Sequence, residues 1–130
     1  LLHDVAKEIP TEKYGRYGFV PDADMPKKVI HAPLGARVAE TDFGVKDKEI
    51  LDAIEFHTTA RPNMTELDKV VYVADKIEES RPYPTKHLMA PTLGEIFVNC
   101  LVDVARVTEK KYGAGRCHPL TREALNFYLK

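Results

Sequence analysis

The chain has 130 residues, enough for one domain with a hydrophobic core, and its 19 basic and 20 acidic residues leave a formal net charge of −1. This balance argues against nucleic acid as a partner, and no apolar run approaches a membrane span or resembles a signal peptide, so we expect no membrane partner. Cys100 and Cys117 are too few for a disulfide framework or a thiolate metal site, which makes a reducing cytoplasm the expected location.

In the first half of the chain, helical periodicity alternates with turn residues. We expect residues 1–8 to be the end of a helix, and residues 11–26, which contain two Gly and two Pro, to be a loop. A helix is predicted from about 27 to 42, with Gly44 after its end. Asp47 is predicted to cap the next helix, whose expected apolar face contains Ile50, Leu51 and Ile54.

In the second half, the clearest helix begins at Thr65, where TELD resembles a capping box with Asp in place of Glu. A long amphipathic helix is predicted over 93–112 and a last helix over 119–129. No strand, internal repeat or linker is convincing, so the sequence predicts one all-α domain. The apolar stripe expected on the helix that begins at Thr65 consists of Leu67, Val70, Val71, Ala74 and Ile77.

Polar residues interrupt these apolar patterns at a few points. His31 begins one predicted helix, His57 follows the apolar positions of the next, and Asp75 borders the apolar stripe of the third. With His3 and Asp4 they make a set of three imidazoles and two carboxylates, expected to be spread over four helices. This donor set suits Fe, Mn, Zn, Co or Ni better than Ca or Mg, and a helical bundle can bring such ligands together.

An ordinary structural role competes with the metal interpretation for each of these residues. A lone His near an apolar face is usually a hydrogen-bonded core or surface residue, and a lone Asp is more often a surface or capping residue. The residues alone therefore leave both interpretations open, and His87 has no support for more than the ordinary one. Gly35, one turn after His31, is a position where a small residue would let another element come close.

Longer strings add a resemblance to a known family. The His3–Asp4 pair with its downstream His and Asp residues resembles the HD-domain metal-dependent phosphohydrolases. Within them, the chain resembles the YqeK family of symmetrical diadenosine tetraphosphate hydrolases, from Leu1 to about Asn126. The strings that carry this resemblance are LLHDVAKEI, HAPLGARVAE, EILDAIEFHTTARPNM, LDKVVYVADKIEESRPYP and HPLTREALN.

The resemblance implies an HD-domain helical bundle that hydrolyses diadenosine tetraphosphate to two ADP with a divalent metal, one or two ions. Iron is the metal it implies, while the ligands also permit Mn, Co or Zn. It implies that Asp4 bridges two metals, that His3 and Asp75 complete one, and that His31 and His57 complete the other. The family pattern has a further ligating His upstream, so we expect residues 1–130 to be an HD domain that lacks its first helix or helices.

The resemblance also implies roles in catalysis and substrate binding. Lys7, beside Asp4 in the catalytic set, could meet a phosphate or the leaving oxygen, although a solvated helix lysine is an equally good account. Arg81 has a guanidinium fork that suits a polyphosphate, and the stretch 118–123 opens a helix whose N-terminus favours anions. The expected substrate-binding residues are His31, His57, Thr58, Asp75, Arg81, His118, Pro119, Leu120, Thr121, Arg122 and Glu123.

Two other functions remain open at this point. The chain is expected to bind a dinucleoside polyphosphate, but an HD phosphohydrolase acting on another nucleotide would have the same ligands. A catalytically inactive domain that binds metal or nucleotide is the second alternative. The sequence allows a homodimer without requiring one.

Overall fold

The computed structural model describes residues 2–21, 26–78, 81–113 and 115–129. These residues contain helices and turns but no strand, so the predicted all-α class is confirmed for the described part of the chain. The α-helices are α1 (Lys27–Phe43), α2 (Lys48–Glu55), α3 (Glu66–Ile77), α4 (Leu93–Tyr112) and α5 (Pro119–Tyr128), and the 3-10 helices are η1 (Leu2–Asp4), η2 (Thr11–Tyr17) and η3 (Lys86–Leu88).

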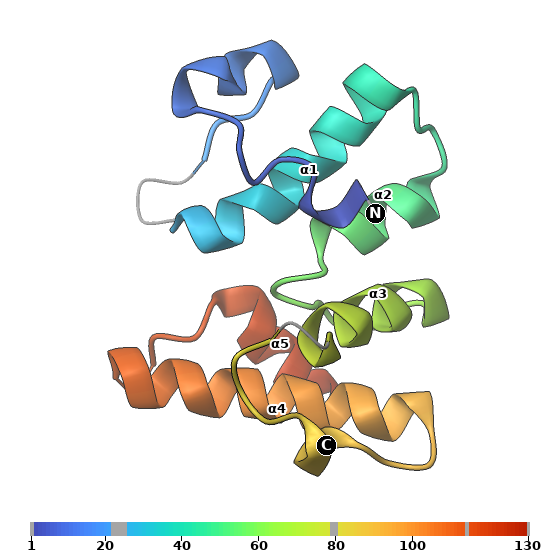
Figure 1. The fold of residues 1–130 in the computed structure, drawn as a ribbon, viewed down its shortest axis with the longest axis vertical. Coiled ribbons are helices and arrows are strands. Elements are labelled where there is room, and N and C mark those ends of the chain that lie inside the picture. The colour runs from blue at the N-terminus through green and yellow to red at the C-terminus, as the bar shows by residue number, and fades with distance from the viewer. Residues whose placement is uncertain (1, 22–25, 79–80, 114, 130) are drawn as a thin grey trace.

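The helices form two parts that lie one above the other in Figure 1. The upper part contains η1, η2, α1 and α2, and the lower part contains α3, α4, α5 and η3. Each part has its own core: Leu34 and Val38 are buried in the upper one, and Tyr72, Phe97 and Leu101 in the lower one. The packing of α2 against α3 joins the two parts. None of the helices in the described ranges is long and apolar enough to cross a membrane.

Several predicted helix boundaries are confirmed. Gly44 ends α1 in the left-handed conformation with φ 68°, as a glycine after a helix end favours. The side chain of Asp47 accepts a hydrogen bond from the main-chain N–H of Glu49 at 2.9 Å and caps α2. Thr65 and Asp68 form both hydrogen bonds of the predicted capping box at the start of α3. The helices predicted over 93–112 and from 119 are α4 and α5, with Pro119 in the first turn.

The prediction of a helix over residues 1–8 is wrong. The described part of this segment has only the short helix η1, followed by turns, because its main-chain bonds span three residues: Val5 N–H donates to Leu2 and Lys7 N–H to Asp4, at 3.2 and 3.1 Å. Such 3-10 bonds are common in short segments that cannot make enough α-helical bonds. The predicted loop 11–26 is also partly wrong, since it begins with η2; residues 22–25 lie outside the described residues.

The predicted buried face of α3 is wrong as well. Val70 of the expected stripe is 44% exposed and Ala74 is exposed, whereas Asp68, Tyr72 and Asp75 are buried. The buried side of α3 carries Tyr72 and Val73 next to charged residues, so apolar periodicity selects a different side of the helix. The two carboxylates lie inside because each has a cationic partner, which offsets the cost of burying a charge. On α2, Ile54 is buried as expected but Ile50 is 41% exposed.

Candidate metal centre

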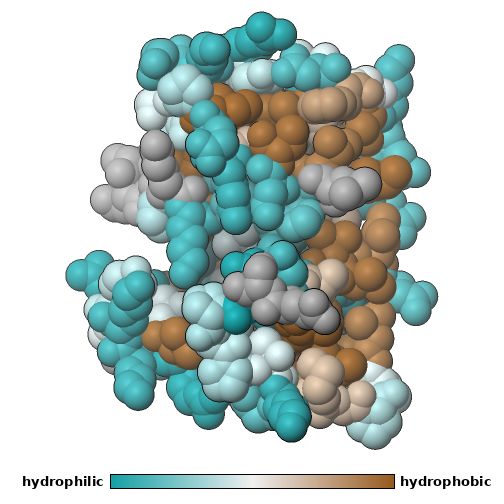
Figure 2. Space-filling model, viewed as in Figure 1, coloured by the Kyte–Doolittle hydropathy of each residue, from teal (hydrophilic) through white to brown (hydrophobic). Residues whose placement is uncertain are grey.

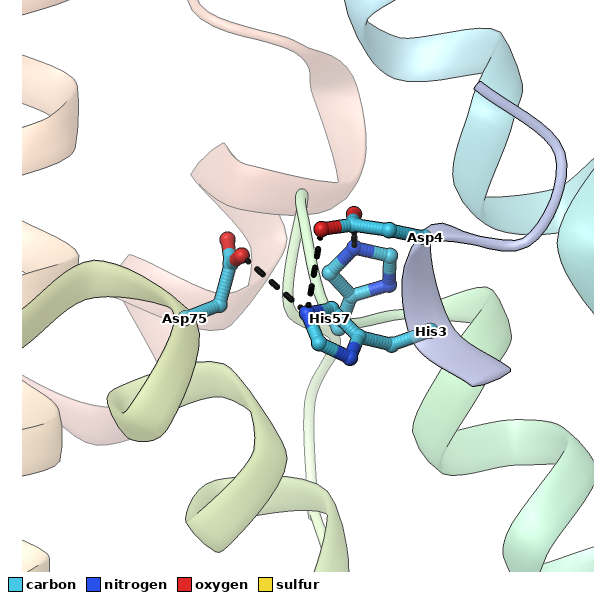
Figure 3. Close-up of side chains that lie close together, drawn as sticks. All are labelled: His3, Asp4, His57 and Asp75. Atoms are coloured by element: carbon cyan, nitrogen blue, oxygen red, sulfur yellow. Dashed lines mark ion pairs between the residues drawn. The ribbon is translucent and has the colours of Figure 1, made fainter. Parts of the chain in front are cut away.

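Four of the predicted ligands meet at one point, from three different elements. His3 and Asp4 come from η1, His57 follows the end of α2, and Asp75 lies on α3, so that all four side chains point toward one another in Figure 3. The Nε2 atom of His3 lies 3.3 Å from Asp4 Oδ2 and 3.5 Å from Asp75 Oδ1. Each residue offers one ligand atom, and these atoms lie within 4.8 Å of one another, which is close enough to surround a metal ion.

His31 on α1 joins the other side of this cluster. Its Nε2 atom lies 3.1 Å from Nε2 of His57 and 3.2 Å from Oδ1 of Asp4. His57 Nε2 in turn lies 3.6 Å from the same Asp4 oxygen. All five residues that the sequence predicts as ligands therefore converge. The prediction that they lie on four helices is only partly right, because His3 and Asp4 lie on a 3-10 helix and His57 lies after the end of α2.

The hydrogen bonds of the two histidines identify which nitrogen carries the proton. Nδ1 of His31 donates to the carbonyl of Lys28 at 2.7 Å, and Nδ1 of His57 donates to the carbonyl of Ile54 at 2.6 Å. A carbonyl oxygen only accepts, so both Nδ1 atoms carry hydrogen and, in neutral rings, both Nε2 atoms present lone pairs. The two Nε2 atoms nevertheless face each other, and the buried Oδ1 of Asp4 has no hydrogen-bond donor among the described residues.

Protonation does not resolve this contact near neutral pH. Burial lowers the pKa of His57 to about 4 and also lowers the pKa of His31, so both rings are neutral at pH 7. Two imidazole lone pairs and one carboxylate oxygen thus surround a common point without a proton between them. A cation at that point would satisfy all three atoms, and neutral imidazole is the form that binds metals.

Asp75 is buried between two cationic side chains. Lys76 Nζ donates to its Oδ2 at 3.1 Å, and Arg81 donates twice, from Nη2 to Oδ1 and from Nε to the main-chain carbonyl of Asp75, both at 2.7 Å. Burial alone would raise the pKa of Asp75, but the two cations outweigh it and the pKa lies below its ordinary value. Asp75 is therefore ionised at neutral pH, as a metal ligand must be.

A glycine on α1 allows η1 to come close to the helix, as its small size predicts. A Cβ atom on Gly35 would lie 3.3 Å from Cγ2 of Ile54 and 3.6 Å from the main-chain oxygen of His3. The first of these distances is shorter than ordinary van der Waals contact. The missing side chain thus lets α1 pack closely against α2 and leaves room for the segment that carries His3 and Asp4.

Hydrogen bonds from α5 and to α3 hold the connection between α2 and α3, which carries His57. The hydroxyl of Thr121 on α5 donates to the carbonyl of Thr59 at 2.8 Å. The Arg61 guanidinium donates to the fully buried carboxylate of Asp68 at 2.6 Å, and so ties this connection to the start of α3. These contacts fix the backbone that positions the His57 ring.

A cleft of about 1210 Å³ begins at the cluster and runs between the two parts of the molecule. Figure 2 shows the hollow on the left of the view, between the upper part that contains α1 and the lower part that contains α4. The lining includes apolar residues, such as Val29 and Val104, as well as cationic ones. The cationic residues that line it are Lys7, Lys28, Lys76, Arg81, Arg106 and Arg116.

Most, but not all, of the expected substrate-binding residues line this cleft. Those that do are His31, Thr58, Asp75, Arg81, His118, Pro119 and Thr121. His57 is fully buried behind the cleft, and Leu120, Arg122 and Glu123 are not among its lining residues. The ring of His118 accepts a hydrogen bond from the N–H of Leu120 at 3.1 Å, so this side chain caps α5.

Sequence reasoning missed two features of the cleft. Lys76 touches Asp75 and lies within it, and only its place next to a candidate ligand could have drawn attention to it. His87, assigned only an ordinary role, lines the cleft with its Nε2 3.2 Å from Asp103, which also accepts from Arg106 at 2.7 Å. No short-range pattern joins His87 to Asp103, since they are 16 residues apart.

Comparison with known proteins identifies relatives of this arrangement. The family model of the HD domain matches residues 1–80. The symmetrical bis(5'-nucleosyl)-tetraphosphatase of Bacillus subtilis is 42% identical over 91 residues, which are 65% of this chain and 48% of that protein. The protein of the same name from Halalkalibacterium halodurans is 46% identical over 57 residues, 44% of this chain and 30% of that protein. The chain thus spans half or less of these curated relatives.

A solved structure extends the similarity over nearly the whole chain. It comes from Clostridium acetobutylicum and is described as a predicted HD superfamily hydrolase involved in NAD metabolism. The similarity has a TM-score of 0.83 at 30% sequence identity and covers 99% of this chain and 72% of that one. On the converging His and Asp residues, the matched family model and this shared fold, the chain belongs to the HD domain family.

Proposed function

We propose that this protein is a metal-dependent hydrolase that cleaves diadenosine tetraphosphate symmetrically into two molecules of ADP. The observation that carries the proposal is the set of three facing lone-pair atoms, on His31, His57 and Asp4, at the end of a cleft with cationic walls. The curated relatives named as symmetrical tetraphosphatases support this substrate. A cleft that combines lysines and arginines with apolar walls fits a polyphosphate flanked by nucleosides.

The donor set supports a divalent transition metal, and we propose iron, with Mn, Co or Zn as substitutes. Asp4 would be shared: its two oxygens face His3 on one side and His31 on the other. His3 and Asp75 would complete one position and His31 and His57 a second. When bound, such a cation supplies Lewis acidity, which makes hydroxide available near neutral pH and withdraws charge from phosphoryl oxygens.

The chain's own residues would bind and orient the polyphosphate. Lys7, whose Nζ lies 3.5 Å from Asp4 Oδ2, lines the cleft next to the cluster and can approach a phosphate or the leaving oxygen. Arg81 lies with its fork at Asp75, at the same end of the cleft, and Thr58 adds a hydroxyl. The two cations, Lys7 and Arg81, would supply positive charge to phosphoryl oxygens on which negative charge develops during phosphoryl transfer.

Product analysis tests this function directly. Purified protein, loaded anaerobically with Fe²⁺ or with Mn²⁺, is incubated with diadenosine tetraphosphate and, in parallel, with nucleoside mono- and triphosphates, and the products are separated by anion-exchange chromatography. We expect ADP as the sole nucleotide product. ATP together with AMP would contradict symmetrical cleavage, and faster cleavage of a mononucleotide would favour an HD phosphohydrolase with another substrate.

Matched histidine variants connect activity to the cluster. His57→Gln removes one of the facing nitrogens, whereas His87→Gln changes a histidine that lines the same cleft away from the cluster. We expect the first to abolish turnover and the second to retain most of it. A wild-type protein that binds metal but cleaves none of these nucleotides would indicate an inactive binding domain.

A further inference from the structure

Lys76 carries a charge that the fold encloses almost completely. Its side chain is 12% exposed, and burial lowers its pKa. Nζ donates to Oδ2 of Asp75 at 3.1 Å and to the main-chain carbonyl of His57 at 3.2 Å, and it lies 4.3 Å from the centroid of the Tyr72 ring. A buried ammonium is costly unless each of its sides finds such partners.

These contacts join two candidate ligands that lie on different elements. Asp75 belongs to α3, while His57 belongs to the connection that follows α2. Lys76 donates its hydrogen bond to Oδ2 of the Asp75 carboxylate. The other oxygen, Oδ1, lies 3.5 Å from Nε2 of His3. The ammonium therefore fixes the rotation of the carboxylate so that Oδ1 faces the cluster.

We propose that Lys76 is a positioning residue of the metal centre, which orients Asp75 and the His57 backbone for metal binding. This inference rests on the metal centre proposed above. Without the Lys76 bond, the carboxylate would be free to turn, and the Arg81 fork, which already donates to Oδ1, would be free to take both oxygens. Partners of metal ligands commonly affect affinity about 10- to 100-fold.

A simple deletion of the ammonium would mix two opposite effects. Losing the hydrogen bonds disorders the ligands and weakens metal binding, whereas losing a positive charge near the metal removes repulsion and strengthens it. The pair Lys76→Gln and Lys76→Met separates them, because both side chains are neutral and of similar length. Only the Gln amide donates hydrogen bonds, so the charge effect cancels in the comparison.

A second lysine on the same helix supplies the control. Lys69 also lies over aromatic rings, 5.2 Å from the centroid of Tyr128 and 5.8 Å from that of Phe97. Lys69→Met therefore removes a half-buried charge and a cation–π contact from α3 without touching Asp75 or His57. Its effect measures what the loss of a lysine from this helix does to folding alone.

The experiment is a titration with Mn²⁺, followed by electron paramagnetic resonance, on the wild type and these variants without substrate. We expect Lys76→Gln to bind Mn²⁺ at least about three-fold more tightly than Lys76→Met, and Lys69→Met to stay within about two-fold of the wild type. Thermal unfolding in chelator checks that each variant folds, and Lys76→Leu replaces Lys76→Met if that variant does not.

Equal or tighter Mn²⁺ binding by the apolar variant would overturn the positioning role, even if both Lys76 variants were less stable. A rise in KM with unchanged Mn²⁺ affinity would also overturn it, since it would show that Lys76 acts on the substrate. A wild type that binds no Mn²⁺ would refute the metal centre itself, and this result is distinct from equal binding by the variants.

Discussion

The Nε2 atoms of His31 and His57 lie 3.1 Å apart, although each ring already donates its Nδ1 hydrogen to a carbonyl. Their lone pairs therefore face each other, and the Oδ1 atom of Asp4 adds negative charge at the same point. Such an arrangement is unfavourable on its own and becomes favourable when a cation enters it.

Divalent metal should accordingly stabilise the fold. A ligand that binds only the native state at 100 times its Kd adds about 2.7 kcal/mol to the free energy of unfolding. We expect Mn²⁺ to raise Tm, EDTA to reverse the effect, and Mg²⁺, which prefers oxygen ligands, to have a smaller one. Scanning fluorimetry measures the shift in Tm, and an unchanged Tm with Mn²⁺ would contradict the proposed metal centre.

Asp75→Asn keeps the shape of the side chain but removes its charge. We expect metal content and turnover to fall together, because an amide is a weaker ligand and Lys76 and Arg81 lose their counter-charge. Stability should fall by about 1.5–3 kcal/mol, the range for hydrogen bonds to charged groups. Elemental analysis and circular dichroism test this, with Asp103→Asn as the control carboxylate in the same cleft. Full turnover by Asp75→Asn would exclude it as a ligand.

The metal-free protein should lose stability in mild acid. The pKa of His57 lies near 4, below its ordinary 6.5, so between these values the unfolded state binds a proton that the folded state does not. This contribution to the free energy of unfolding is therefore present above pH 6.5 and declines as the pH falls toward 4, by about 1.4 kcal/mol for each pH unit. The lowered pKa of His31 acts in the same direction.

Denaturant unfolding in chelator between pH 7.5 and 4.5 measures this decline. His57→Gln should reduce the slope, because it removes the group whose protonation differs between the two states. Equal slopes in the wild type and His57→Gln would mean that protonation of His57 does not cause the loss of stability in acid. Asp75 adds a further loss only below its ordinary 3.8, since its pKa is lowered.

Gly35→Ala should disturb the cluster more than the helix. The new Cβ would lie 3.3 Å from Cγ2 of Ile54, whose carbonyl accepts from Nδ1 of His57, so Ile54 must move by a few tenths of an ångström. The 3.6 Å distance to the His3 oxygen is an ordinary contact. Gly94→Ala, with no atom within 4 Å of its Cβ, is the matched control and should add up to about 1 kcal/mol of helix stability. We expect weaker Mn²⁺ binding for Gly35→Ala alone. Unchanged binding would show that the Ile54 side chain adapts without displacing His57.

Arg61→Met should destabilise the fold strongly. It leaves the Asp68 carboxylate, which is fully buried, without its partner at 2.6 Å, and breaking a buried pair costs about 3–5 kcal/mol. Arg106→Met breaks an exposed pair with Asp103 and should cost at most about 1 kcal/mol. Urea unfolding compares the two, and similar losses would mean that the Arg61 pair is no more than a surface contact.

Local signals predicted much of this fold. Thr65, Asp47 and Gly44 were found from the sequence because caps are short-range hydrogen bonds and backbone conformations that neighbouring residues determine. The five candidate ligands also stood out, since a polar side chain beside an apolar pattern requires an explanation wherever it lies in the fold.

What the sequence could not predict depends on partners from elsewhere in the chain. The buried side of α3 follows from the cations beside Asp68 and Asp75, two of which, Arg61 and Arg81, lie outside the helix. The partnership of His87 with Asp103 likewise appears only when η3 packs on α4. Periodicity counts apolar residues and contains no information about such ion pairs.

The capping box at Thr65 sets more than the first turn of α3. Each residue of an α-helix turns the chain by 100°, so the rotational register chosen at the cap is transmitted unchanged to every later side chain. Asp75 lies ten residues after Thr65 and faces the cluster only in this register. A start displaced by one residue would point the carboxylate a quarter-turn or more away, so that a threonine hydroxyl remote from the cleft determines the geometry of the metal centre.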